Sequence, residues 1–600
     1  MDSISERRMG LVAWTIPILA AGLTGCFGGS SSDSGSDGST GSAGDSLPHL
    51  SGLDSDADNH DLLFFTSPID NAEGLYAIDP DTPSDPAIEV DTEFEQAQMV
   101  NHHRNFFPIH EASWDNESQT LSEFRVDRVL YGDKQFGSFG MRSVSTDPGA
   151  TVNPTSREVT SEELMPLDLN VMFLFSLEEA DETAVVYSTD DEYKRFLMGD
   201  DDDTSPLEVD SHLVPVALVW DPETGAGRGW LVVDTADNNR LKKTDMDFNT
   251  GPGTVQDPSG NDIEDLYAGK DDDPWHSVSA LGSVLADGSQ FLTLRFEDPD
   301  SDDTPPAELW HYQPPTNDGA GTMTQAENGS GEPLEFGETI LPPGGVNLPP
   351  PSRITTDGDA LYFAHAEPSL IAGGAGTLYR VDADGWSELD TEEDIGDFVL
   401  ASAGRVAWSA NEEVISVDTQ GGDRQILDTT DSLYGQDISG PVRGSRDGWI
   451  FYNRDEGMTG ETHVAVAAKV DGSSRIDLYD AQWVGASTSG RAQAGNQVDE
   501  LELSEVLMQQ ETDSGVRLAA VSAEDPEAGK VILGDLPSGA HTATMFGLAP
   551  GPHRLLQTAY GESPVSYEVI YVNTQEEGSL TTVSGQPSEE QDVLRPVEGF

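Results

Sequence analysis

The sequence predicts an all-β protein built from many short strands. From about residue 62 onward, short β-branched and aromatic runs alternate with Asp-Gly, Pro-Asp and glycine-rich turns, and few segments show the period of an amphipathic helix. Of the 600 residues, 36% are hydrophobic and 8% aromatic, so the chain has enough core-forming residues to fold despite a formal charge of −80. That charge excludes nucleic acid as a partner, because binding to phosphates needs a basic surface.

Residues 1–25 have the features of an export signal. Arg7 and Arg8 form a positive start, and the uncharged apolar run from Met9 to Leu23 follows. This run is too short to span a membrane comfortably, which takes about 20 residues, and it suits the core of a signal peptide. The twin arginines leave Tat export open beside Sec export, although Gly10 stands where the Tat motif prefers a bulky apolar residue.

The signal ends in Leu23-Thr24-Gly25-Cys26, which resembles the lipobox of prokaryotic lipoproteins. The resemblance implies cleavage between Gly25 and Cys26 and acylation of the Cys26 thiol, as with palmitate. Cys26 is the only cysteine of the chain, and it stands where the lipobox requires one. We therefore expect a signal peptide at 1–25 and a lipid anchor on the membrane of the cell envelope. Two or three acyl chains anchor far more firmly than one.

Residues 26–60 are expected to be the lipidated cysteine and a flexible tether. Glycine, serine and aspartate dominate the first part of this segment, and such a composition cannot bury apolar surface. Among lipoproteins of this kind, an aspartate directly after the lipidated cysteine is associated with retention in the inner membrane. This chain has Phe27 at that position. If the host is a diderm bacterium, the expected location is the outer membrane.

The acidity of the chain resembles that of proteins from halophilic organisms. There are 110 Asp and Glu residues against 30 Lys and Arg, and only 7 of the basic residues are lysine. A dense carboxylate surface stays hydrated when salt screens its repulsion. Runs such as Asp200–Asp203, Asp271–Asp273 and Asp298–Asp303 are therefore interpreted as solvated faces or loops.

The alternating carboxylates Asp54, Asp56 and Asp58 resemble the first half of an EF-type calcium-binding loop. The pattern then fails, since Asn59 replaces the turn glycine and Phe65 stands where the bidentate glutamate belongs. No calcium site and no cofactor other than the covalent lipid is predicted.

A pair of strands recurs along the body, 61–600. The second run of each pair is apolar and ends in Asp or Asn, and most copies lead into a turn. The copies of this second run are Leu75–Asp79, Trp230–Asp234, Leu378–Asp382, Val414–Asp418, Ala467–Asp471 and Val569–Asn573. Three of the preceding runs open on an Asp-Gly turn, at 287–288, 357–358 and 447–448.

This unit resembles the blades of TolB-like β-propellers, in which an S-x-D-G turn opens one strand and the next ends near V-D. The resemblance implies a β-propeller of seven or eight blades, at about 40–50 residues per blade. The alternative is two or more β-rich domains, with the proline-rich stretch 341–351 as a boundary. A separate C-terminal β module at 516–583 also stays open.

Catalytic motifs are not recognisable. Gly-x-Ser-x-Gly does not occur outside the tether, His110-Glu111 does not continue to a second zinc-binding histidine, and no phosphate-binding loop is present. His102, His103, His110 and Glu111 include enough metal ligands for zinc, but adjacent histidines on a strand point to opposite faces. These histidines are therefore taken as surface or packed residues, with no metal site and no catalytic residues predicted.

The expected function is a non-enzymatic, lipid-anchored envelope propeller that binds an envelope protein or polymer. The anchor, the tether and the absence of a catalytic signature favour it, although a fold does not fix a function. The alternative is an envelope hydrolase or lyase acting on polysaccharide or peptide through acidic residues in the central channel. The sequence leaves open whether the chain is an enzyme and favours the non-enzymatic interpretation.

Overall fold

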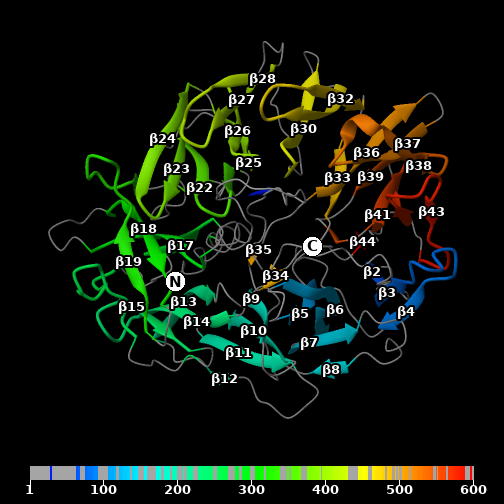
Figure 1. Ribbon diagram of the computed structural model, residues 1–600. Coiled ribbons are helices and arrows are strands. Elements are labelled where there is room, and N and C mark those ends of the chain that lie inside the picture. Colours follow the sequence, from blue (N-terminus) through cyan, green and yellow to red (C-terminus); the bar gives the residue numbers. More distant parts are fainter. Residues whose placement is uncertain are drawn as a thin grey trace, which may run out of the picture.

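The computed structural model describes an all-β chain whose sheets follow one another around a ring (Figure 1). The described residues are 28–29, 62–67, 74–91, 106–115, 120–135, 138–145, 155–157, 170–177, 182–189, 192–198, 207–208, 212–220, 227–245, 248, 253–267, 277–282, 285, 287–297, 304–315, 319–337, 348–349, 353–366, 375–393, 395–429, 444–456, 462–479, 483–488, 493–494, 497–498, 503–512, 515–544, 549–550, 552–561, 565–587 and 595–596. For 106–208 the structure describes strands and their pairing.

Ten sheets of three to five strands make up the ring, and we number them in chain order. Sheet 1 has β2 (Leu63–Ser67), β3 (Gly74–Ile78), β4 (Ile88–Asp91) and β44 (Arg595–Pro596). Sheet 2 has β5 (Phe106–Asp115), β6 (Thr120–Gln135), β7 (Ser138–Ser145) and β8 (Thr155–Arg157). Sheet 3 has β9 (Asn170–Leu177), β10 (Glu182–Thr189), β11 (Glu192–Met198) and β12 (Leu207–Glu208). Sheet 4 has β13 (Leu213–Trp220), β14 (Gly227–Asp234) and β15 (Arg240–Thr244).

The next three sheets occupy the middle of the chain. Sheet 5 has β16 (Val278–Leu281), β17 (Gln290–Leu294), β18 (Ala307–Gln313), β19 (Thr322–Gln325) and β20 (Glu335–Phe336). Sheet 6 has β21 (Ile354–Thr356), β22 (Leu361–Ala366), β23 (Gly376–Asp382) and β24 (Gly385–Glu392). Sheet 7 has β25 (Ile395–Ser402), β26 (Arg405–Ala410), β27 (Glu413–Asp418), β28 (Gln425–Thr429) and β1 (Gly28–Gly29).

The last three sheets complete the ring. Sheet 8 has β29 (Gly444–Arg446), β30 (Trp449–Glu456), β31 (Thr462–Lys469) and β32 (Arg475–Tyr479). Sheet 9 has β33 (Trp483–Thr488), β36 (Leu503–Thr512), β37 (Gly515–Ser522), β38 (Lys530–Asp535) and β40 (Ala549–Pro550). Sheet 10 has β39 (Ala540–Thr544), β41 (His553–Tyr560), β42 (Ser566–Asn573) and β43 (Thr581–Thr582). A ribbon of β34 (Gln493–Ala494) and β35 (Gln497–Val498) and a 3-10 turn at Pro526–Ala528 are additional.

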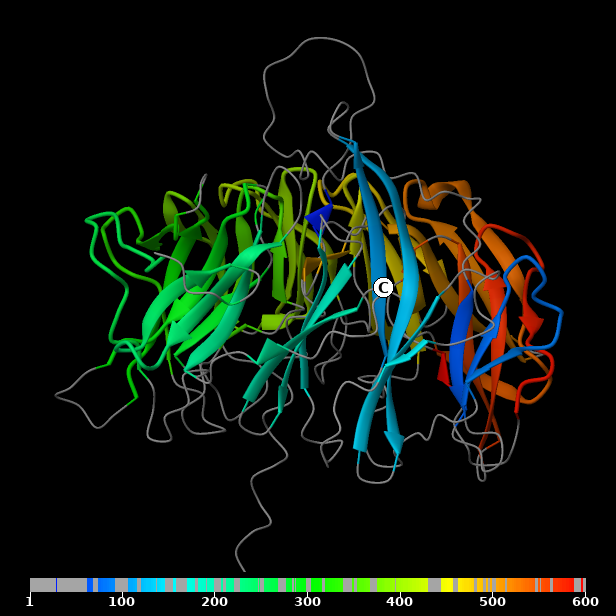
Figure 2. The same cartoon turned by 90° about the horizontal axis from the view of Figure 1, so that it is seen from below.

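The two ends of the ring meet in sheet 1. There β44, from the C-terminal end of the chain, pairs antiparallel with β2, from its N-terminal part. The sheet 1 and sheet 10 strands β2 and β41 are also in contact. Seen from the side, the sheets form one thick band, and the long pair β5 and β6 stands out among their neighbours (Figure 2). Radial repetition of this kind leaves only short sheet edges exposed.

The predicted all-β propeller architecture is confirmed. The described residues form ten sheets, compared with the seven or eight blades expected. The difference comes from residues 106–208, where the strand-pair motif is blurred but two complete sheets form. Sheets form there without the motif because β-pairing requires only alternating strands and turns.

In most sheets the recurring strand pair is the second and third strand, and in the three-stranded sheet 4 it is β13 and β14. In sheet 6, β21 is followed by the turn at 357–358, then β22, then β23, which ends on Asp382. Gly358 has φ +88°, a conformation that favours glycine. The Asp-Gly turn and the turn after the terminal Asp therefore lie at the same end of the sheet, because successive strands are antiparallel.

The terminal Asp or Asn of this unit has a structural role in every described copy. Its side-chain Oδ1 accepts a hydrogen bond from the backbone N–H two residues later, so the residue forms an Asx turn into the next strand. The acceptors are Asp79, Asp234, Asp382, Asp418, Asp471 and Asn573, at N···O distances of 2.8 to 3.1 Å. Hydrogen bonds from the backbone of Gly422 and Gln420 lower the pKa of Asp418. Some of the many aspartates of the chain therefore stabilise its turns by accepting these hydrogen bonds.

Neighbouring sheets pack face to face through apolar clusters. Three tryptophans lie in these clusters or the core around them: Trp230 and Trp408 are fully buried and Trp449 is 4% exposed. In the sequence, the proline-rich stretch 341–351 separates sheet 5 from sheet 6, and these two sheets share one hydrophobic cluster that includes Phe336 and Phe363. Residues 516–583 belong to sheets 9 and 10, and β37 pairs with β36 over its whole length.

The predicted signal peptide at 1–25, the cleavage site between Gly25 and Cys26, and most of the tether lie outside the described residues. Gly28 and Gly29 are described, and they pair in parallel with β25. The carboxylates Asp54 to Asp58 also lie outside, whereas Phe65 is fully buried and stacks on Tyr76. Within the described residues, no helix is long and apolar enough to cross a membrane.

Candidate functional site

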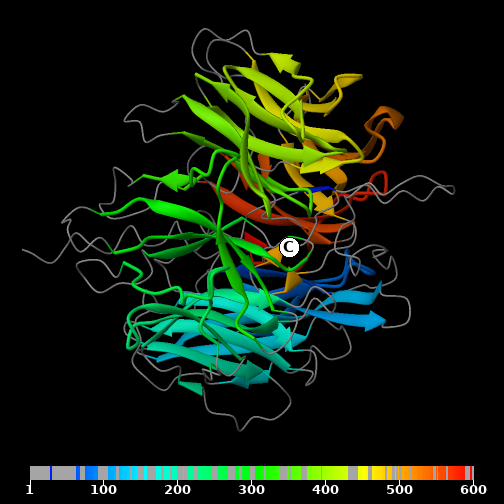
Figure 3. The ribbon, with the colours of Figure 1, turned by 60° about the vertical axis from the view of Figure 1, so that its left-hand side comes forward.

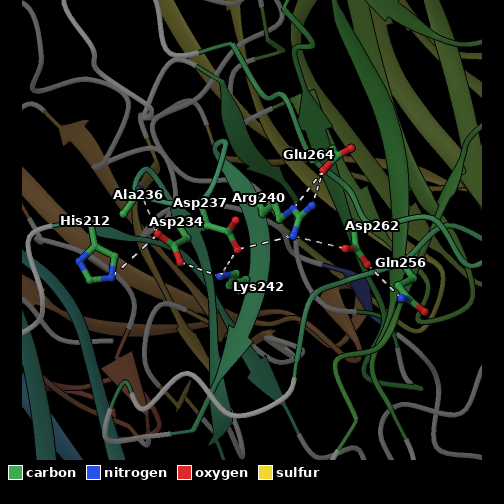
Figure 4. A network of polar contacts seen from close by, with 9 residues as sticks. All are labelled: His212, Asp234, Ala236, Asp237, Arg240, Lys242, Gln256, Asp262 and Glu264. Atoms are coloured by element: carbon green, nitrogen blue, oxygen red, sulfur yellow. Dashed lines mark hydrogen bonds and ion pairs between the residues drawn. The ribbon is translucent and has the colours of Figure 1, made fainter.

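A network of charged side chains lies where sheet 4 turns from β14 into β15 (Figure 4). His212 immediately precedes β13, and the pairing of Leu213 with Asp234 places it beside the end of β14. Two hydrogen bonds to the His212 carbonyl oxygen, from the backbone N–H and the hydroxyl of Thr235, fix its backbone there at 2.8 and 3.2 Å. The sheet register thus positions an imidazole that is 37% exposed.

Asp234 is the centre of the first half of this network. Its side chain is 7% exposed, and its Oδ1 lies 3.9 Å from His212 Nε2. The same Oδ1 accepts the backbone N–H of Ala236 at 3.0 Å, and Oδ2 accepts a hydrogen bond from Lys242 Nζ at 2.7 Å. Both oxygens are therefore held, so Asp234 presents a fixed negative charge to the imidazole.

Lys242 connects Asp234 to the second half of the network. Its ammonium lies 2.7 Å from Asp234 and 2.7 Å from Asp237. Burial lowers the pKa of Lys242, but the hydrogen bonds to the two carboxylates more than offset this and raise it overall. The hydrogen bond from Lys242 in turn lowers the pKa of Asp237. Lys242 and Asp237 are therefore both charged at neutral pH.

Arg240 is surrounded by three carboxylates. Its Nε and Nη2 donate to one oxygen of Glu264 at 3.0 and 2.7 Å, and Nη1 lies 3.6 Å from both Asp237 and Asp262. The hydrogen bond to Glu264 raises the pKa of Arg240. Counting Asp234, the network has four carboxylates and two cations, so it keeps a net charge of −2 when His212 is neutral.

The turn itself is rigidly placed. Asn238 and Asn239 have φ of +54° and +50°, and Asn239 donates a side-chain hydrogen bond to the carbonyl of Leu266 at 3.0 Å. Asparagine adopts this left-handed conformation more readily than most residues.

An exposed imidazole beside a fixed carboxylate can accept a proton and hold the resulting imidazolium, which is the requirement for general acid–base catalysis. The 3.9 Å gap is longer than a hydrogen bond, as is common before a substrate is bound.

The other residues considered from sequence are not brought into this network. Cys26 and Gly25 lie outside the described residues, as do His102 and His103. His110 and Glu111 lie on β5, opposite Val126 and Arg125 of β6. In the part of the chain that the structure describes, no group of three or more His, Cys, Asp or Glu side chains could hold a metal ion.

Sequence reasoning missed His212, Lys242 and Arg240. Their contacts join residues that the sheet register brings together, and no short motif records this. One signal was available: three of the 30 basic residues fall within four positions, at Arg240, Lys242 and Lys243. In so acidic a chain, such a concentration marks a place where carboxylates converge.

No protein-family model and no curated protein matches the chain. Similar solved structures include a puromycin-hydrolysing peptidase from Mycobacterium tuberculosis, the tricorn protease and dipeptidyl peptidase 4 from Porphyromonas gingivalis, each 10% identical. They cover 80%, 87% and 76% of this chain, with TM-scores of 0.27, 0.24 and 0.31. The chain matches only 54%, 58% and 64% of the length of these peptidases.

These comparisons correct the expected function. The preference for a non-enzymatic binding or scaffold protein is contradicted by this finding, since these three similar structures are peptidases. At 10% identity the likeness shows the fold alone.

Proposed function

We propose that the chain is a lipid-anchored hydrolase of the cell envelope that acts on peptide or polysaccharide, with His212 as its proton-transfer group. The observation that carries the proposal is the exposed His212 imidazole beside Asp234, whose two oxygens are held by Ala236 and Lys242. Peptide is the substrate class to test first, because it is the class named for the similar peptidases.

In the proposed reaction, His212 Nε2–H faces Asp234 and leaves Nδ1 as the proton acceptor. Nδ1 takes a proton from a water molecule while the water oxygen bonds to the scissile carbonyl carbon. The imidazolium is stabilised by the Asp234 carboxylate and then returns the proton to the leaving nitrogen as the C–N bond breaks. Lys242 acts as a positioning residue, since it fixes Asp234 without facing the substrate.

Replacing His212 by asparagine is expected to lower kcat/KM for peptide hydrolysis by about 100-fold or more, because general acid–base catalysis contributes a factor of that order. K242Q should reduce kcat less and shift the pH profile, because Asp234 would lose its anchor. E388Q, on an exposed position of β24, is the matched control and should leave the rate unchanged.

The measurement is release of new amino termini from defined peptides by the purified full-length protein, with reducing-sugar release from polysaccharides in parallel. If H212N hydrolyses a substrate as fast as the wild type, His212 is not the proton-transfer group.

The envelope location rests on Cys26, and we propose that its thiol is acylated after cleavage of the chain behind Gly25. Mass spectrometry of the protein from its native membrane should find an acylated Cys26 at the mature amino terminus, and C26A should remain uncleaved and unacylated. In a diderm host, the wild-type protein should fractionate with the outer membrane. An unmodified Cys26 in the wild type would contradict the anchor.

A further inference from the structure

Sheets 5 and 6 lie next to each other in the ring (Figures 1 and 3) and share one hydrophobic cluster. Phe291 and Phe336 contribute from sheet 5, and Leu361 and Phe363 contribute from sheet 6. We call this contact between sheets 5 and 6 the joint. Polar contacts across it include two hydrogen bonds from Trp386, from its backbone N–H to Glu327 O at 3.2 Å and from Nε1 to Glu332 O at 2.9 Å.

His311 is buried on the sheet 5 side of the joint. It lies on β18, is 6% exposed, and its ring centre is 5.1 Å from that of Phe291. Its Nε2 has no hydrogen-bond partner among the described residues. The charged groups that act on it are Asp287, in the turn before β17, and Asp382, at the end of β23 in sheet 6. Burial lowers the pKa of His311 although both carboxylates act to raise it.

His365 lies on the sheet 6 side of the same joint. It is near the end of β22, and its ring meets Phe336 of sheet 5 edge-on, with centres 5.1 Å apart. The charged group that acts on it is Arg353, just before β21. Burial, helped by this guanidinium, lowers the pKa of His365 to about 4.

We propose that the joint between sheets 5 and 6 is an acid-sensitive opening point of the ring, operated by protonation of His311 and His365. Each imidazole packs against a phenyl ring of the shared cluster, so a proton on either ring places a charge in an apolar contact that holds two sheets together. His212, by contrast, is 37% exposed and can be protonated in water without disturbing a core.

The direction of the effect follows from linkage. A histidine whose pKa is lower in the folded than in the unfolded chain adds stability above its unfolded pKa of about 6.5, and this stability is lost as the pH falls toward the folded value. For His365 that interval runs down to about 4. Protonation of surface carboxylates works the other way, because it reduces self-repulsion in a chain of charge −80. Acid opening is therefore a specific property of the buried His311 and the half-buried His365.

Hydrogen exchange of the full-length protein from pH 7 to pH 4, at constant molar salt and corrected for intrinsic rates, tests the proposal. Strands β17, β18 and β22 should lose protection first, while β26, β27, β30 and β31 of sheets 7 and 8 stay protected. Loss of protection in all sheets together, or first in another joint, would overturn it. This readout on the wild type does not depend on any variant folding.

The double variant H311F/H365F keeps aromatic volume and removes both titrating groups. Its midpoint for loss of protection in the joint should move down by about one pH unit. H365F alone should give part of the shift if the double variant does not fold. H212F, which removes an exposed histidine, is the control and should keep the wild-type midpoint. An unchanged midpoint in H365F would refute the proposal.

Discussion

Replacing Arg454 by methionine is expected to destabilise the protein by about 3 kcal/mol, because it breaks a buried ion pair and leaves a carboxylate behind. Arg454 lies on β30 of sheet 8, and its Nη1 donates to both oxygens of Asp428, on β28 of sheet 7, at 3.1 and 3.0 Å. Their side chains are 7% and 2% exposed. The pair therefore joins two neighbouring sheets out of contact with water.

Asp428 has further partners that set the size of this loss. Tyr452 donates its hydroxyl to Asp428 Oδ2 at 2.8 Å, and Arg475 Nε lies 3.2 Å from the same oxygen. Burial raises the pKa of Asp428 although the hydrogen bonds from Tyr452 and Arg454 oppose it. Because Arg475 remains, we place the loss near the lower end of the range of about 3–5 kcal/mol for breaking a buried pair.

The matched control is R517M. Arg517 pairs with Asp535 at 2.6 Å, but their side chains are 37% and 52% exposed, so this loss should be within about 1 kcal/mol. Urea unfolding at constant salt would measure the free energy of unfolding of both variants and of the wild type. If R454M were as stable as R517M, the buried pair would not hold sheets 7 and 8 together. Adding Asp428→Asn to R454M should recover part of the loss, since the unpaired charge is then removed.

Replacing Trp408 by alanine is expected to cost about 3–5 kcal/mol, the range for truncating a buried tryptophan. Trp408 lies on β26, is fully buried, and packs in the cluster between sheets 6 and 7 with Tyr362, Leu378 and Ile415. Alanine would leave a cavity between two sheets that the strands cannot close without moving.

W408F separates packing from hydrogen bonding at the same position. Phenylalanine keeps most of the ring and removes Nε1, which has no hydrogen-bond partner among the described residues. The loss for W408F should therefore be about 1 kcal/mol. If W408F were as costly as W408A in urea unfolding, the indole N–H would have to make a hydrogen bond that matters.

The strand pairs were predictable because they depend on local pattern. Runs such as Trp230–Asp234 and Val414–Asp418 alternate with turns, and the structure places them at the end of β14 and along nearly all of β27. The role of the aspartate that ends these runs was not predicted. Its side chain accepts hydrogen bonds from backbone N–H groups of the following turn. A carboxylate in so acidic a chain gives no sign in sequence of whether it faces water or caps a turn.

The number of sheets and the candidate site were not predictable for a different reason. Both depend on which strands become neighbours, and β44 pairs with β2 across almost the whole sequence. Arg240 meets Glu264, and His212 meets Asp234, only after β13, β14 and β15 take their register. Contacts between residues so far apart in the sequence produce no periodic pattern of residue types by which they could be predicted.

The measurement that tests the central claim most directly is incubation of the purified full-length protein with a diverse peptide library at high salt. Mass spectrometry would compare the new amino termini released by the wild type with those released by H212N. We predict cleavage by the wild type that is largely lost in H212N and retained in E388Q. Absence of cleavage by the wild type, together with no release of reducing sugars from polysaccharides, would contradict the assignment as a hydrolase.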